Sequence, residues 1–285
     1  MYLPSLFESF TKERQFLRGV TPATLRWYAC SWQAFEPHLP SSTADLSGAR
    51  LKAAMVSIAA NGLRPVTVNT YTRCINAFLA WMHAEGHTPE RLKIAKLKEP
   101  DLKPRTLRPE HIRCIVRWTP RTHAATRLQV LLMLLLDCGL RISETLALER
   151  SAIDFEQSTL TVLGKGRKQR TVPVSKEMRR RLWVWLKSHQ HELVFATRDG
   201  RALSNRNVQH AMRRARKALA LPEGQRFSPH VLRHTFATGY LRRGGDPFRL
   251  QRILGHSTLA MTLRYCSLEV GDLCAVHDRY SPLAS

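Results

Sequence analysis

The stretch between residues 128 and 136 places the strongest constraint on the fold, because it offers solvent no polar face. Within it only Gln129 is polar, so a helix here is apolar around nearly its whole circumference. Such a helix has to be surrounded by other elements, and we expect it to be the buried central helix of a packed domain. Gly139 follows soon after and permits a sharp turn at the helix end.

A break in the pattern divides the chain into two parts. Residues 93–105 are rich in charge and contain Pro100 and Pro104, which is typical of a linker. We therefore expect a first domain over residues 1–99 and a second over residues 105–285. The length of 285 residues suits two domains of ordinary size.

The first part has the apolar periodicity of helices. Thr21 and Pro22 suit an N-cap and the first helical position, and amphipathic helices are expected around residues 51–60 and 66–83. Aromatic residues at helical spacing are expected to fill the core rather than to stack on bases. Four basic residues are candidate phosphate contacts, with a solvated charged face as the open alternative: Arg26, Lys52, Arg64 and Arg73.

In the second part, the pattern predicts several helices and one short pair of strands. Residues 159–163 and 171–174 are β-prone and flank the segment 164–170, which predicts a β-hairpin with a glycine-rich basic tip. Helices are expected over residues 108–118, from about 124 to 138, over 176–187 and 205–218, after Ser228, and over 247–254. The predicted fold class is therefore mainly α, with a helical first domain and a mostly helical second domain that contains a small antiparallel sheet.

The charge of the chain points to a polyanionic partner. The sequence has 45 basic and 22 acidic residues, a formal net charge of +23, which most simply indicates nucleic acid. A basic protein with a solvated surface is the alternative. The six cysteines form no C-x-x-C pair, so a reducing cytosol is favoured over a disulfide framework. No signal peptide opens the chain, and the longest apolar run is too short to cross a bilayer.

Two patterns resemble cofactor sites but lack a required residue. His230 and His234 have the spacing of a zinc helix, yet Val231 stands where the H-E-x-x-H motif needs glutamate. Lys165 follows a glycine, yet Gly166 stands where a P-loop needs Ser or Thr. We therefore expect neither a metal nor a nucleotide cofactor.

Cationic side chains occupy positions suited to an anion. His230 and Arg233 share one face at the start of a predicted helix, whose N-terminus also favours an anion. Arg141 follows the turn after the buried helix, and Glu144 lies one turn further on. An ion pair alone would explain these two residues, and so would an arginine that binds a ligand phosphate while the glutamate braces it.

His256 and Tyr265 are nine residues apart, so on a straight helix they would lie on roughly opposite faces. They can converge only if the chain bends, and residues 255–257 are a plausible place for the bend. A phenol has a reference pKa of about 10 and becomes a useful nucleophile when nearby cations stabilise its phenolate. Taken alone, a tyrosine at helical spacing is more simply a core residue.

Four segments in order resemble the catalytic domain of the tyrosine recombinases, the phage integrase and Xer-like group. They are Cys138–Glu144, Gly164–Gly166, Ser228–Thr235 and Leu254–Tyr265. The first part resembles, more weakly, the helical SAM-like core-binding domain of that family. The resemblance implies that residues 105–285 form a DNA-cleaving catalytic domain.

The resemblance also implies a role for each candidate residue. Tyr265 would attack a DNA phosphodiester and leave a 3′-phosphotyrosyl bond and a free 5′-hydroxyl. Arg141 and Arg233 would hold the non-bridging oxygens, and His230 and His256 would complete the cage. Lys165 would protonate the leaving 5′ oxygen. Rejoining would need neither ATP nor metal.

At the level of the whole protein, the family resemblance implies a site-specific recombinase that integrates, excises or resolves DNA, as in mobile elements. It would act in the cytoplasm on nucleoid DNA, as a homo-tetramer on two double-stranded sites, with a related recombinase or accessory protein as further possible partners and no membrane contact. The tail over residues 268–285 resembles the family's docking tail, with a core-packing helix as the alternative. A type IB topoisomerase-like strand transferase and a non-catalytic DNA-binding relative are the competing functions.

Overall fold

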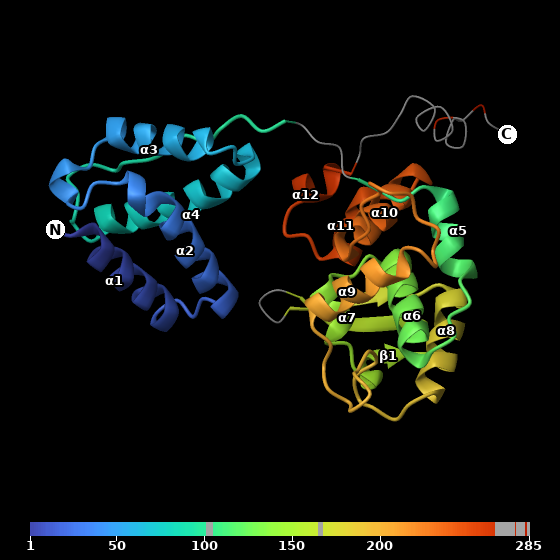
Figure 1. Cartoon of the computed structure of the whole chain (residues 1–285). Helices are drawn as coiled ribbons and strands as arrows, with labels where there is room; N and C mark the ends of the chain where they lie inside the picture. Colours follow the sequence, from blue (N-terminus) through green and yellow to red (C-terminus); the bar gives the residue numbers. More distant parts are fainter. Residues whose placement is uncertain (101–104, 165–167, 266–276, 278–282, 284–285) are drawn as a thin grey trace. The chain divides into compact units, whose positions relative to one another are not determined.

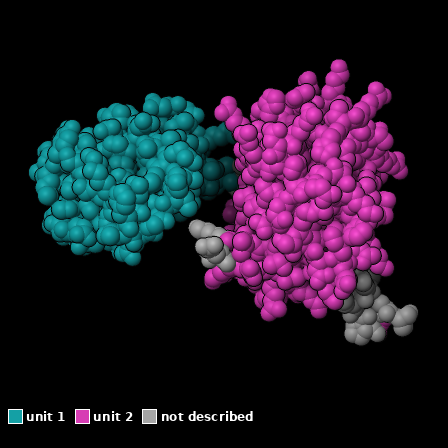
Figure 2. All heavy atoms as spheres, turned by 90° about the horizontal axis from the view of Figure 1, so that it is seen from below, with its two compact units in different colours: residues 1–101 teal, residues 102–285 magenta. Residues whose placement is uncertain are grey.

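The computed structural model describes residues 1–100, 105–164, 168–265, 277 and 283. The chain divides into two compact units, Met1–Asp101 and Leu102–Ser285, which are coloured separately in Figure 2. Over the part of the chain described, no helix is long and apolar enough to cross a membrane.

The described residues of the first unit form four α-helices, with two short 3-10 helices, Glu36–His38 and Thr43–Asp45, between the second and the third (Figure 1). The helices are α1 (Leu3–Phe16), α2 (Pro22–Phe35), α3 (Gly48–Ala60) and α4 (Pro65–Ala84). The side chain of Thr21 caps α2 by accepting a hydrogen bond from the backbone N–H of Thr24 at 3.3 Å. The predicted helical first part is confirmed, although its sequence pattern had not delimited α1.

Aromatic side chains form the centre of the first unit. Phe7 stacks on Trp32 with ring centroids 4.3 Å apart, and Phe78 meets both rings edge-on. Phe10 and Phe35 are fully buried in the same cluster. These aromatic residues therefore fill the core, as predicted. The four basic candidates for phosphate contacts are all exposed: Arg26, Lys52, Arg64 and Arg73.

The second unit combines helices with a small sheet. Its elements are α5 (Pro109–Arg117), α6 (His123–Cys138), α7 (Ile142–Leu146), β1 (Ile153–Asp154), β2 (Thr159–Leu163), β3 (Gln169–Pro173), α8 (Lys176–Lys187), α9 (Asn205–Ala215), α10 (Pro229–Arg242), α11 (Pro247–Leu254) and α12 (Leu259–Leu263). The three strands are antiparallel in the order β1-β2-β3. The mainly helical fold with a small antiparallel sheet is confirmed.

Helix α6 is the buried centre of the second unit, as its apolar sequence predicted. It packs against α5, α7, α8, α9 and α10 (Figure 1), and Leu131, Leu132 and Leu135 are 1% exposed or less. Gln129 is also buried, and its amide donates hydrogen bonds to the backbone carbonyls of Ile115 and Trp118. The one polar residue of the stretch therefore stabilises the end of α5.

The predicted hairpin is present, and the pairing of its two strands fixes the position of β3, which carries Arg170. Leu160 faces Val172 across β2 and β3, and both side chains are fully buried. Strand β1 has only two residues, too few to show an alternating pattern, and was not predicted. The hairpin tip over residues 165–167 and the tail over residues 268–285, apart from 277 and 283, lie outside the described residues.

One helix end differs from the sequence-based expectation. The helix expected over residues 205–218 ends at Ala215. The backbone N–H groups of Leu219 and Leu221 bond back to Ala215 and Arg216, and Ala220 adopts a positive φ of 48°. The chain therefore turns away in place of a last helical turn.

Candidate active site

A pocket of about 820 Å³ on the second unit brings together five of the six candidate residues. Its lining combines α7, α10 and the segment that runs from the end of α11 to Tyr265. The candidates that line it are Arg141, His230, Arg233, His256 and Tyr265. Lys165, the sixth, lies outside the described residues.

The turn after α6 places Arg141 at this pocket. Gly139 closes α6 with a φ of 60°, in the left-handed region that favours glycine. A Cβ at this position would also collide with the ring of Phe236 on α10. Arg141 then forms the N-cap of α7, where its backbone N–H donates to the carboxylate of Glu144 at 2.8 Å.

Glu144 holds two arginines in place. Its carboxylate accepts hydrogen bonds from the guanidinium of Arg141 at 2.8 Å, and Arg170 on β3 forms a bidentate pair with it, also at 2.8 Å. Burial raises the pKa of Glu144, but the bonds and charges of Arg170 and Arg141 outweigh this effect and lower it to about 2. The carboxylate is therefore ionised at neutral pH and fixes Arg141 at the mouth of the pocket.

Arg233 is the most deeply buried cation of the pocket, with 5% of its surface exposed. Its guanidinium donates to the backbone carbonyls of Gly139 at 2.6 Å and of Leu254 at 2.8 Å. Burial and the nearby charge of Arg141 lower its pKa to about 10, so it remains protonated at neutral pH. Arg233 thus joins the ends of α6 and α11 while it presents a positive charge to the pocket.

The chain bends between α11 and α12, as the convergence of His256 and Tyr265 required. Gly255 ends α11 with a φ of 64°. His256 then lies between two partners, because Nε2 is 3.1 Å from the Arg233 guanidinium and Nδ1 is 2.9 Å from the hydroxyl of Thr262. The arginine can only donate, so Nε2 accepts and Nδ1 carries the proton. Burial and the charges of Arg233 and Arg141 lower the pKa of His256 to about 4, which keeps it neutral.

Tyr265 is buried, with 7% of its surface exposed, and it lines the pocket. The Oη atom of Tyr265 lies 3.2 Å from Nδ1 of His234. The tyrosine ring stacks with the ring of His256 at a centroid distance of 6.1 Å. The same ring packs against Ala237 and Leu254 in a small apolar cluster. The tyrosine is therefore both a core residue and a pocket residue.

His230 occupies the first turn of α10, where Ser228 caps the helix and Pro229 takes the first position, as predicted. Its side chain is exposed and lines the pocket. His234 follows one turn later, closer to Tyr265. The two histidines therefore share one helix face, but the structure separates them into an exposed position and a half-buried one.

Sequence reasoning missed two residues of this arrangement. Arg170 was treated only as part of a basic hairpin, because nothing in its spacing connects it with Glu144, 26 residues earlier. His234 was considered only as a zinc partner of His230. Its position one helical turn after His230 was a signal that it lies on the same face, but not that it meets Tyr265.

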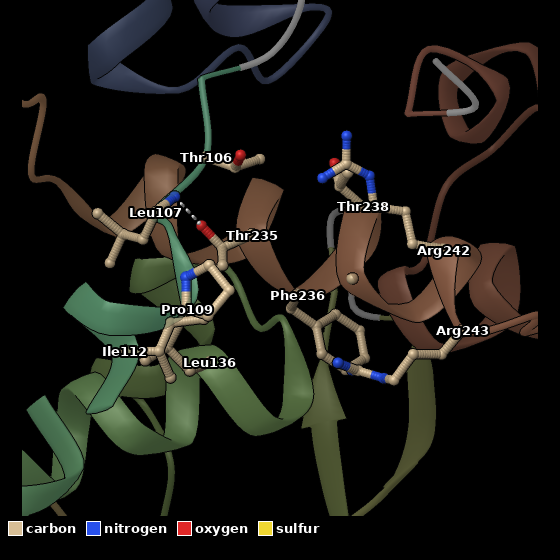
Figure 3. A pocket seen from close by; sticks show the side chains of 11 residues that line it. Thr106, Leu107, Pro109, Ile112, Leu136, Thr235, Phe236, Thr238, Arg242 and Arg243 are labelled. Atoms are coloured by element: carbon tan, nitrogen blue, oxygen red, sulfur yellow. Dashed lines mark hydrogen bonds between the residues drawn. The ribbon is translucent and has the colours of Figure 1, made fainter. Parts of the chain in front are cut away.

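A second, smaller cavity of about 310 Å³ lies elsewhere on the second unit, beside α10, and contains none of the five candidates that the structure describes (Figure 3). Here the backbone N–H of Leu107 donates to the hydroxyl of Thr235 at 2.8 Å. Phe236 lines the cavity as well and packs close to Gly139. This side of α10 therefore anchors the segment before α5, whereas His230, Arg233 and His234 line the larger pocket.

Comparison with known proteins supports the resemblance seen in the sequence. The phage integrase family matches residues 105–270. The tyrosine recombinase XerC of Shewanella amazonensis is 30% identical over 98% of this chain and 97% of its own length. The tyrosine recombinase XerC of Chromobacterium violaceum is also 30% identical, over 95% of this chain and 93% of its own length.

Solved structures share the fold of the whole chain. The Tn1549 transposon integrase, in complex with a circular intermediate DNA, has a TM-score of 0.82 at 19% identity and covers 99% of this chain and 100% of that one. A lambda integrase dimer bound to a core site has a TM-score of 0.74 at 22% identity, over 92% and 97%. The family match and the two XerC relatives show that the chain belongs to the phage integrase family and is a tyrosine site-specific recombinase.

Proposed function

We propose that the larger pocket is the active site of this recombinase and that Tyr265 cleaves a DNA strand there. The phenolic oxygen attacks a backbone phosphorus, a bond from phosphorus to the tyrosine forms, and the bond from phosphorus to the 5′ oxygen breaks. A 3′-phosphotyrosyl intermediate and a 5′-hydroxyl result. The observation that carries this proposal is the presence of Tyr265 in one pocket with Arg141, Arg233 and His256.

The two arginines suit the charge that develops in this reaction. Displacement at phosphorus gathers negative charge on the non-bridging oxygens, and the planar guanidinium groups of Arg141 and Arg233 meet such oxygens in pairs. Arg233 has five N–H groups, and its bonds to Gly139, Leu254 and His256 account for three of them. Among the described residues no partner bonds to the other two, which are therefore available to the phosphate. Because both arginines are held before DNA arrives, little reorganisation accompanies the reaction.

The two histidines complete the cage in different ways. His256 is neutral and already bonded to Arg233 and Thr262, so it fixes the buried guanidinium as well as facing the phosphate. His230 is exposed at the N-terminal turn of α10, where the helix end favours an anion. We assign His230 to direct binding of the scissile phosphate, and His256 to holding the Arg233 guanidinium against that phosphate.

Lys165 is the general acid in this proposal. It belongs to the hairpin whose strand β3 carries Arg170, and Arg170 bonds to Glu144 and to the carbonyl of Ile253 at 2.8 Å. The base of the hairpin is thus anchored beside the pocket. A lysine carried on that hairpin can give its proton to the leaving 5′ oxygen. Because the phosphotyrosyl bond keeps the energy of the cleaved bond, rejoining uses no ATP.

The partner in this proposal is double-stranded DNA that carries recombination sites. The net charge of +23 suits a polyanion, and the structural relatives named above were solved with DNA. The first unit takes the part of the core-binding domain, with exposed Arg26, Lys52, Arg64 and Arg73 as phosphate contacts. Exchange between two sites calls for a homo-tetramer, and the setting is nucleoid DNA in the cytoplasm.

The test starts from a pool of duplexes with a random central region and a nick that lets the released fragment diffuse away. Duplexes that become covalently attached to the wild-type protein are recovered and sequenced, which yields a reactive site. Tyr265→Phe should bind this site with unchanged affinity and form no adduct, because the variant lacks only the attacking oxygen. An adduct with the Phe variant would overturn the assignment.

The same site then tests recombination. Two duplexes with this site and differently labelled flanks should exchange their flanks when mixed with the wild-type protein. Relaxation of supercoiled DNA without any exchange of flanks would instead indicate topoisomerase action. If duplexes from the starting pool bind the wild-type protein but none becomes attached to it, the protein is a non-catalytic relative.

A further inference from the structure

The side chain that meets the attacking oxygen is a residue to which the sequence pattern gave no role. His234 lies on α10, and its Nδ1 atom is 3.2 Å from Oη of Tyr265. The two rings are tilted by 47° with centroids 5.3 Å apart. This is hydrogen-bond geometry rather than stacking, so the histidine is directed at the phenol through its nitrogen.

The protonation of His234 suits an acceptor. Burial lowers its pKa, and the charges of His230, Arg233 and Arg264 lower it further. The ring is therefore neutral at neutral pH and holds one proton. With that proton on Nε2, Nδ1 has a lone pair for the phenolic O–H. A phosphate that enters the pocket adds negative charge, which favours a cationic imidazole at this position.

The neighbouring histidines are placed for other tasks. Both nitrogens of His256 are engaged, with Arg233 and with Thr262, and its ring lies beside the tyrosine ring at an interplanar angle of 18°. His230 is exposed one helical turn before His234. Among the residues that the structure describes, the hydrogen bond recorded for Oη of Tyr265 is the one to His234.

We propose that His234 is a further catalytic residue, which accepts the phenolic proton of Tyr265 as the oxygen attacks phosphorus. In this step the O–H bond breaks, its proton passes to Nδ1, and the oxygen lone pair forms the bond to phosphorus while the 5′ oxygen leaves. During rejoining the imidazolium returns the proton to the departing phenolate. The inference rests on the proposed role of Tyr265.

Two substitutions separate proton transfer from simple positioning. His234→Asn places an amide oxygen near the position of Nδ1, so it can accept the hydrogen bond but is too weakly basic to take the proton. His234→Ala removes both functions. His210→Asn, at an exposed position on α9 outside the pocket, is the matched control. Melting curves of all variants verify that they fold.

The rate of adduct formation is measured in single-turnover reactions on the nicked duplex selected above. Because general base catalysis typically contributes about 100-fold or more, both His234 variants should react about 100-fold more slowly than the wild type and bind DNA equally well. His210→Asn should react at the wild-type rate. If His234→Asn reacts at the wild-type rate, His234 does not accept the proton of Tyr265. If His234→Ala also reacts at the wild-type rate, His234 has no role in cleavage.

A substrate with sulfur in place of the bridging 5′ oxygen distinguishes the base from the acid. Thiolate leaves without a proton, so this substrate should restore the rate of Lys165→Ala but leave His234→Ala about 100-fold slow. Restoration of both variants would contradict the assignment of His234 to the attacking side.

A measurement without DNA keeps the inference separate from the proposed function. In the free wild-type protein, ¹⁵N NMR of histidine should show His234 as the neutral tautomer with its proton on Nε2, and Tyr265→Phe should change its Nδ1 signal. A proton on Nδ1 would overturn the inference even if DNA is cleaved. Failure of the wild type to form any Tyr265-dependent adduct would instead refute the proposed function.

Discussion

Glu144→Gln tests the electrostatic frame of the pocket. The carboxylate bonds to Arg141 and, through two bonds, to Arg170, and its side chain is 3% exposed. Its pKa falls from an ordinary value of 4.5 to about 2. Because one pKa unit corresponds to about 1.4 kcal/mol, this charge stabilises the folded second unit by about 3 kcal/mol at pH 7. The glutamine variant should lose about that much free energy of unfolding.

The contribution of Glu144 to the free energy of unfolding should depend on pH, and the direction follows from its lowered pKa. The folded state holds the proton of Glu144 less tightly than the unfolded state does. The stabilisation is therefore complete above pH 4.5 and is lost as the pH falls toward about 2. Urea unfolding of wild type and variant should differ by about 3 kcal/mol at pH 7, and the difference should shrink steadily below pH 4.5.

Glu177→Gln is a matched control on α8. Hydrogen bonds from Arg180 and Arg181 lower the pKa of Glu177 to about 2 as well, but its side chain is 50% exposed. Solvent screens such a pair, so its loss should cost about 0.5 kcal/mol. Equal losses for the two glutamine variants, or a difference at Glu144 that does not change with pH, would refute the reasoning.

Two further substitutions test the active-site lysine and the turn before Arg141. Lys165→Ala should slow cleavage of ordinary DNA by about 100-fold but cleavage of the 5′-sulfur substrate much less, in single-turnover assays; equal slowing on both would remove the general-acid role. Gly139→Ala should destabilise the second unit by more than about 1 kcal/mol, because its positive φ is strained for alanine and the new Cβ meets Phe236. A melting temperature equal to that of the wild type would contradict this account of the turn.

Local chemistry made much of the fold predictable. The stretch around Gln129 has no polar face and became the buried helix α6. Thr21 with Pro22, and Ser228 with Pro229, marked the starts of α2 and α10 because capping depends on adjacent residues. Strand β1, only two residues long, and the early end of α9 at Ala215 were missed because they depend on pairing and turns formed elsewhere in the chain.

The residues of the site that lie within the family motifs could be predicted from the sequence. The segments that resemble the family contain Arg141, Arg233 and Tyr265, and the structure places these residues in one pocket. The partners of those residues were harder to predict, because contacts between distant segments leave no spacing in the sequence. Arg170 meets Glu144 from another element, and His234 meets a tyrosine 31 residues later.

The assignment of Tyr265 as the nucleophile requires that this residue becomes joined to the 3′ end of the cut strand. Mass spectrometry of the adduct, after digestion of its protein and DNA parts, identifies the linkage. We expect a peptide that carries a nucleotide 3′-phosphate on Tyr265, together with a free 5′-hydroxyl on the released strand. A linkage to any other residue, or a tyrosine joined to a 5′-phosphate, would contradict it.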